Sequence, residues 1–194
     1  MNELPLVLQL DVSGNPLRWI IYEKSAYYYA KDRVAWSMGQ VDFDLHGGTS
    51  ALTGKQSILT VNTIIAVREE NKNKSKKHFA INTRVPLTNK ALFRRDQNIC
   101  AYCGNDFSSK DLSRDHIMPV SKGGPDIWTN VVTACTSCNK RKDNKTLEQA
   151  GLELLYVPYA PNRAEWLILH NRTILADQME FLMKLVPKES RLLA

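Results

Sequence analysis

The fold of this chain is decided by residues 100–142, which read CAYCGNDFSSKDLSRDHIMPVSKGGPDIWTNVVTACTSCNKRK. The stretch contains all 4 cysteines of the chain, in two Cys-x-x-Cys pairs, Cys100/Cys103 and Cys135/Cys138. Each pair places two thiolates across a tight turn. Four thiolate sulfurs at about 2.3 Å from one ion give the closed tetrahedral coordination of structural zinc. The pattern therefore predicts one structural zinc ion bound by all four cysteines.

The alternatives to a metal site are disulfides and redox chemistry. The chain has 194 residues, 43% of them hydrophobic, and a chain of this length buries a sufficient core without disulfides. Its start, Met1–Pro5, lacks the features of a secretory leader, and no apolar stretch is long enough to cross a bilayer. We therefore expect a protein of the cytoplasm without membrane association, where thiols stay reduced. A redox-active Cys-x-x-Cys is a weaker alternative, because nothing indicates a thioredoxin-like βαβ unit.

Positive charge gathers around the cysteines. The chain carries a net charge of +6 and has a pI near 9.1. The segment from Arg84 to Lys145 holds eleven Lys and Arg against six acidic residues, which places +5 of the +6 there. A basic patch of this kind is typical of nucleic-acid binding. The sequence predicts DNA as the partner and leaves RNA open.

The segment between the cysteine pairs completes a pattern. It reads Asp115-His116-Ile117-Met118-Pro119, then Gly123-Gly124, then Asn130, and Cys138 is followed by Asn139 and Lys142. In residue types and spacing the pattern resembles the HNH endonucleases, which have a ββα-metal finger, and the resemblance is most specific over residues 94–143. It implies a hairpin over 112–116 and 130–133, with a helix starting near Thr136.

The resemblance also implies roles for individual residues. His116 would be the general base, because imidazole accepts a proton near neutral pH. Asp115 and Asn139 would hold a catalytic Mg²⁺ or Mn²⁺ through hard oxygen ligands. Asn130 would tie the loop together and orient His116, and Lys142 would meet a phosphate oxygen. The third motif position is Asn139 and not His, which favours Mg²⁺ or Mn²⁺ over softer metals.

The remaining sequence predicts an α+β protein in three parts. Residues 1–87 form a mixed α/β scaffold, with strands in 4–10, 41–45 and 58–67 and a helix over 17–31. Residues 88–146 form the zinc-stapled finger, entered by a short helix that Thr88 caps and that runs through Arg95. Residues 147–194 are mostly helical, with one long or two short helices over 164–186 that cover the scaffold; a homodimer interface is the alternative role for them.

Three further alternatives stay open. A four-cysteine finger also occurs in zinc proteins that bind nucleic acid without cutting it, although such a protein has no use for Asp115 and His116 beside Asn139. The polar run 68–78 is interpreted as a solvated loop, with a DNA-contacting arm as the alternative. Arg94 and Arg95 are expected either to contact a phosphate or to be solvated.

Overall fold

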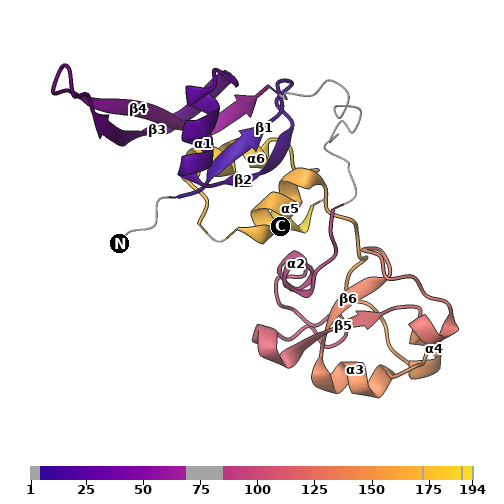
Figure 1. The fold of residues 1–194 in the computed structure, drawn as a ribbon. Helices are drawn as coiled ribbons and strands as arrows, with labels where there is room; N and C mark the ends of the chain where they lie inside the picture. Colours follow the sequence, from indigo (N-terminus) through magenta and orange to yellow (C-terminus); the bar gives the residue numbers. More distant parts are fainter. Residues whose placement is uncertain (1–4, 69–84, 172, 189, 194) are drawn as a thin grey trace. The chain divides into compact units, whose positions relative to one another are not determined.

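The computed structural model describes residues 5–68, 85–171, 173–188 and 190–193, and it confirms an α+β protein (Figure 1). The chain forms two compact units, each of which is described here by itself. The first consists of Met1–Thr83 and Arg163–Val186, and the second of Arg84–Asn162 and Pro187–Ala194. Apart from Arg68, the predicted polar loop 68–78 lies outside the described residues.

A four-stranded sheet with the order β2-β1-β4-β3 forms the base of the first unit. β1 (Val7–Leu10) pairs antiparallel with β2 (Pro16–Ile20) and parallel with β4 (Gln56–Val67). β4 also pairs antiparallel with β3 (Val34–Thr49), and the two continue as a long ribbon beyond the sheet (Figure 1). The predicted strands over 41–45 and 58–67 are confirmed within β3 and β4.

Helices cover both faces of this sheet, which explains why every residue of β1 is buried. Successive side chains of a strand point to opposite faces. Leu8 packs in one core cluster with residues of α5 (Arg163–His170) and α6 (Ala176–Met183). Val7 packs in another cluster with residues of α1 (Tyr22–Ala30).

The predicted helix over 17–31 is wrong in its first part. Residues 16–20 form β2, in which Trp19 pairs with Leu8 and Ile20 with Val7. Tryptophan and isoleucine fit a pleated, half-buried surface, and proline is tolerated at the first residue of an edge strand. Pairing with β1 therefore decides the conformation, and α1 begins only at Tyr22.

The C-terminal helices are the two short ones that the sequence allowed, α5 and α6. Their apolar side chains, Leu167 and Leu182 among them, are buried against the sheet of the first unit. The segment 147–194, predicted as a separate third part, is divided between the two units: residues 163–186 belong to the first, and residues 147–162 and 187–194 to the second.

The second unit is a hairpin followed by a helix. β5 (Leu112–His116) pairs antiparallel with β6 (Val131–Cys135), and α3 (Thr136–Lys142) follows directly. β5 has the predicted bounds, whereas β6 starts at Val131 and leaves Asn130 in the loop. α4 (Leu147–Ala150) follows α3.

None of the described helices has the length and apolar character needed to span a membrane.

The helix that leads into the hairpin begins as predicted. α2 (Asn89–Arg95) has Thr88 at its N-cap, and the Thr88 hydroxyl accepts a hydrogen bond from the backbone N–H of Ala91. Such a cap satisfies one of the N–H groups that the first turn leaves free. The last residue of α2, Arg95, is completely buried. Placing Arg95 on a phosphate or in solvent is therefore wrong.

Candidate active site and zinc centre

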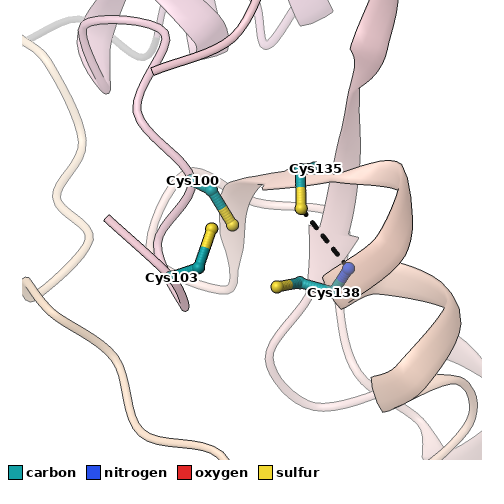
Figure 2. Close-up of side chains that lie close together, drawn as sticks. All are labelled: Cys100, Cys103, Cys135 and Cys138. Atoms are coloured by element: carbon teal, nitrogen blue, oxygen red, sulfur yellow. Dashed lines mark hydrogen bonds between the residues drawn. The ribbon is translucent and has the colours of Figure 1, made fainter. Parts of the chain in front are cut away.

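The four cysteines converge from two segments of the second unit (Figure 2). Cys100 and Cys103 lie in the turn after α2, Cys135 ends β6 and Cys138 lies in the first turn of α3. Their sulfur atoms all lie within 4.8 Å of one another. Tetrahedral coordination at about 2.3 Å separates sulfurs by about 3.8 Å. The cluster is therefore compatible with structural zinc.

The local backbone prepares both cysteine turns. After Cys103, Gly104 has a φ of +74°, a conformation that glycine adopts without strain, and its N–H donates to the carbonyl of Cys100. In the second turn the N–H of Cys138 donates to the sulfur of Cys135 at 3.4 Å. The Cys-x-x-Cys spacing thus produces two compact turns that direct sulfur atoms to one point.

The thiols influence one another's pKa values. Burial first, and then the neighbouring Cys135 and Cys100, raise the pKa of Cys138 to about 12. Burial also acts on Cys100, but backbone hydrogen bonds led by that of Cys135 outweigh it and lower the pKa to about 7. A bound cation would offset the repulsion between thiolates, and this chemistry suits a metal centre.

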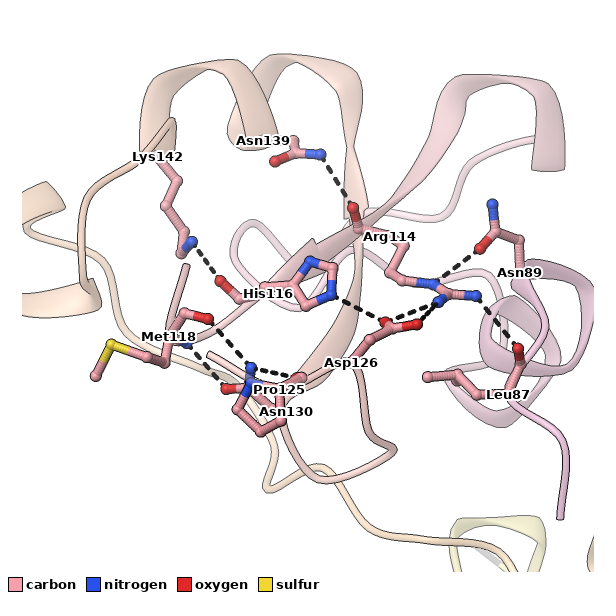
Figure 3. A network of polar contacts seen from close by, with 10 residues as sticks. All are labelled: Leu87, Asn89, Arg114, His116, Met118, Pro125, Asp126, Asn130, Asn139 and Lys142. Carbon is pink, nitrogen blue, oxygen red and sulfur yellow. Dashed lines mark hydrogen bonds and ion pairs between the residues drawn. The ribbon is translucent and has the colours of Figure 1, made fainter. Parts of the chain in front are cut away.

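His116, the last residue of β5, is held by a carboxylate that the sequence motif does not include (Figure 3). Its Nε2 lies 2.9 Å from Oδ1 of Asp126, and its side chain is 22% exposed. Arg114 donates to both oxygens of Asp126, at 2.8 Å each. The hydrogen bond from Arg114 is the main cause that holds the pKa of Asp126 below its usual value, with a further contribution from His116.

Asp115 points the other way, into the interior of the unit, as adjacent residues of a strand do. Its Oδ1 lies 3.0 Å from Nζ of Lys142, and its Oδ2 accepts a hydrogen bond from the hydroxyl of Tyr102. Burial, and then this hydrogen bond, raises the pKa of Tyr102 above its usual range, so the phenol stays a donor. Asp115 is thus held by two buried donors.

Lys142 does not lie where the resemblance placed it. It is completely buried, and its ammonium donates to Asp115 and, at 2.7 Å, to the carbonyl of His116. The expected contact with a phosphate oxygen is corrected accordingly. Lys142 lies in the last turn of α3 and faces the buried carboxylate of Asp115. The attraction between these two charges holds the ammonium beside the end of β5.

The two asparagines of the motif have different surroundings. Nδ2 of Asn139 donates to Oγ of Ser113 at 2.7 Å, and Oδ1 of Asn139 has no hydrogen-bond partner within the described ranges. Asn130 bonds through Oδ1 to the N–H of Met118 and through Nδ2 to the carbonyls of Met118 and Pro125. Asn130 ties the loop together, whereas the side-chain contact to His116 comes from Asp126.

Gly124 shows why this loop needs glycine. A Cβ at Gly124 would lie 1.8 Å from the carbonyl oxygen of Met118, a distance that no side chain permits. The close approach of the two backbone segments brings Pro125 and Asn130 within bonding reach of each other. The Gly-Gly pair therefore serves the folding of the loop that carries Asp126.

A groove of about 500 Å³ runs between β5, the loop after it and α3. Asp115, His116, Asn139 and Lys142 all line it, together with the exposed Lys140. Asn130 is not among its lining residues. The structure thus brings the predicted base and both predicted ligands for a catalytic cation to one groove, although the predicted ligand Asp115 is nearly buried at its floor.

Sequence reasoning missed two residues that organise this site, Asp126 and Tyr102, and placed a third, Arg95, wrongly. The available signal for Asp126 was its position just after the Gly-Gly pair, because the loop that contains this pair leads back to the end of β5. Arg95 had no sequence signal, because a basic residue before a cysteine pair is usually solvated. Its guanidinium bonds Asp96 and the carbonyls of Trp128, Val131 and Tyr159.

The hairpin, the helix and the cysteine cluster define a ββα finger with a candidate zinc centre. Residues 100–155 match the family model described as HNH endonuclease, which confirms the resemblance for this segment. The match implies a nuclease-type finger and a nucleic acid as its partner. A search of curated proteins finds no match.

Proposed function

We propose that this protein is a metal-dependent endonuclease that hydrolyses DNA phosphodiester bonds at the groove between β5 and α3. The observation that carries the proposal is that His116, Asp115 and Asn139 line one groove inside the segment that matches the HNH endonuclease family. Four cysteines beside the groove would hold a structural zinc ion that takes no part in the chemistry, because four thiolates leave no open position for water.

His116 is the proposed general base. Its ring is partly exposed to the groove, and its Nε2 is occupied by Asp126. A neutral imidazole held in this way accepts a proton from water through its other nitrogen. The carbonyl of His116 is fixed by Lys142, which holds the end of β5 in place.

Asp115 and Asn139 are the proposed ligands of the catalytic cation. Asn139 lines the groove, and its Oδ1 has no hydrogen-bond partner among the described residues. An ionised carboxylate keeps lone pairs in addition to those used by Lys142 and Tyr102. Hard oxygen donors of this kind fit Mg²⁺ or Mn²⁺. The cation, when bound, would neutralise charge on the phosphate and on the leaving oxygen.

The second candidate is a zinc protein that binds nucleic acid without cutting it. The observation in its favour is that both oxygens of Asp115 are already engaged by Lys142 and Tyr102. Cleavage assays separate the two, because binding requires neither His116 nor a divalent cation in the groove.

The test is nicking of plasmid DNA by the full-length, zinc-loaded protein. We expect cleavage with Mg²⁺ or Mn²⁺ and none in a buffer that contains neither ion, with one zinc per chain still bound in both cases. His116→Ala should abolish cleavage while zinc content and DNA affinity persist, since a general base acts in the transition state. The matched control is His46→Ala, which removes an exposed histidine of β3.

Ligand variants add a second arm. Asn139→Ala should cut poorly at low Mg²⁺ and recover in part as the metal concentration rises, whereas no metal concentration should restore His116→Ala. Ser113→Ala removes the shorter of the two hydrogen bonds that Nδ2 of Asn139 donates, to Ser113 and to the carbonyl of Arg114, but keeps Oδ1 of Asn139, and it should retain most activity. A wild-type protein that cuts no DNA with any divalent cation would favour the non-catalytic alternative.

A further inference from the structure

His116 has one ring nitrogen occupied and one open. Nε2 lies 2.9 Å from Oδ1 of Asp126. Nδ1 has no hydrogen-bond partner in the part of the chain that the structure describes, and Figure 3 shows it on the side of the ring away from Asp126. The two nitrogens of His116 therefore have different surroundings, and these surroundings decide which nitrogen carries the proton.

Asp126 is itself fixed in position. Nη1 of Arg114 donates to both of its oxygens, at 2.8 Å each. Arg114 is held in turn by Oδ1 of Asn89 at 2.9 Å, at the first turn of α2 (Figure 3). A charge-assisted hydrogen bond to both oxygens restricts the orientation of the carboxylate. The chain from Asn89 through Arg114 and Asp126 to His116 thus connects α2, β5 and the loop after β5.

We propose that Asp126 is a positioning residue that holds neutral His116 in the tautomer with its proton on Nε2, so that Nδ1 is the atom that accepts the proton of the attacking water. The inference deepens the proposed function and rests on it for the catalytic part. The tautomer itself is a property of the folded protein and is measured without any cleavage.

The chemistry of the pair supports this assignment. An ionised carboxylate only accepts hydrogen bonds, so a neutral imidazole that bonds to it through Nε2 must donate from Nε2. Nδ1 then keeps its lone pair and faces away from the acidic group. In a serine-histidine-aspartate triad the aspartate likewise sets the tautomer and orientation of the histidine.

The first test is nuclear magnetic resonance of the ¹⁵N-labelled, zinc-loaded, full-length protein at about pH 8.5, where an ordinary imidazole is neutral. The chain has 4 histidines, and the resonances of His116 are identified by their loss in His116→Ala. We expect the ¹⁵N shift of an unprotonated nitrogen at Nδ1 and a protonated one at Nε2. A wild-type His116 with its proton on Nδ1 overturns the proposal, whether or not the protein cuts DNA.

The second test uses Asp126→Asn, in which an amide of nearly the same shape can donate to Nε2 instead of accepting from it. In a buried triad the corresponding change lowers turnover by about 10⁴-fold. Asp126 is 54% exposed, so we expect a smaller loss of kcat, about 10- to 100-fold. The affinity for DNA and the zinc content should stay unchanged. Asp126→Glu, which restores the carboxylate, should recover part of the rate.

Asp111→Asn is the matched control, because it removes one exposed carboxylate of the same unit without touching His116. It should keep the wild-type kcat. An Asp126→Asn protein that cuts at the wild-type rate, with Nδ1 of His116 still unprotonated, overturns the inference and leaves the proposed function standing. A wild-type protein that never cuts contradicts the proposed function and the catalytic part of this inference. The tautomer of His116 is still tested by magnetic resonance.

Discussion

Two basic side chains, Lys142 and Arg95, lie completely inside the finger, and each faces a carboxylate. Burying an unpaired charge is costly, so both are tied by several hydrogen bonds. Arg95 connects α2 to carbonyls of the segment around Trp128 and Val131. Lys142 connects α3 to the end of β5. These two residues fix the elements on which the groove is built.

Removing Lys142 should destabilise the finger strongly. Lys142→Met leaves Asp115 buried without its cation, and breaking a buried pair in this way costs about 3–5 kcal/mol. The measurement is the free energy of unfolding in urea with zinc present. Lys140→Met, a change in the same helix at an exposed position, should alter stability by less than about 0.5 kcal/mol.

The double variant Lys142→Met/Asp115→Asn sharpens this prediction. It removes both charges, and we expect it to be more stable than Lys142→Met alone, because no uncompensated charge then stays buried. If Lys142→Met unfolds at the same urea concentration as the wild type, the ammonium does not stabilise Asp115 and our assignment of Lys142 is wrong.

At the scale of elements, the cysteine cluster joins the turn after α2 to the junction of β6 and α3. The cysteines also make up much of the core of the finger, where Cys100, Cys135 and Cys138 are buried beside Val132 and Leu152. A core of this size depends on a metal staple for much of its stability. Zinc is therefore expected to hold the ends of the finger together.

We predict one zinc per chain and a finger that unfolds without it. Structural zinc contributes about 10–16 kcal/mol of binding free energy in zinc-finger peptides. Strong chelation, or Cys135→Ser, should abolish the slow hydrogen exchange of the backbone amides in β5, β6 and α3. Since thiols release protons when they bind zinc, the affinity for zinc should fall as the pH is lowered.

Ser137→Ala is the control for the zinc prediction, because it changes an exposed residue between Cys135 and Cys138 and no ligand. It should keep one zinc per chain. Purified protein that contains no zinc, or a Cys135→Ser protein whose melting is unchanged, would contradict the interpretation of the cysteines.

For the whole molecule, the distribution of charge matters more than its total. The net charge is +6, and Lys140, Arg141 and Lys145 are exposed in and after α3. Lys140 lines the groove itself. Buried Lys142 and Arg95 contribute little to this outward-facing charge, so the exposed residues of α3 are the proposed contacts to DNA phosphates.

DNA binding should therefore weaken steeply as salt rises. Each phosphate contact contributes about −0.9 to the slope of log K against log salt concentration for duplex DNA. Lys140→Ala and Arg141→Ala should each reduce this slope by about 1, measured by fluorescence anisotropy on a labelled duplex. Lys110→Ala, an exposed lysine before β5, serves as the comparison and should change the slope less.

An affinity that stays constant from low to physiological salt would contradict the charge-based footprint. If the slope of log K against log salt concentration in Lys140→Ala and Arg141→Ala equals that of the wild type, the DNA contacts lie on another surface. Neither result bears on the zinc centre, which is tested by metal content.

Much of this protein was accessible from the sequence because the signals were local. The two Cys-x-x-Cys pairs predicted a metal cluster, and the bounds of β5, the start of α3 and the Thr88 cap agree with the structure. Ligand spacing, strand alternation and capping each involve only a few neighbouring residues, so the sequence alone is enough to predict them.

The tertiary structure alone decided what depends on partners far along the chain. Residues 17–20 became a strand because β1 pairs with them, and Arg95 and Lys142 are buried because carboxylates and carbonyls meet them inside the unit. Asp126 reaches His116 because the loop folds back on β5. Pairing and burial are set by which surfaces meet on folding, and the free energies involved exceed the preferences of single residues.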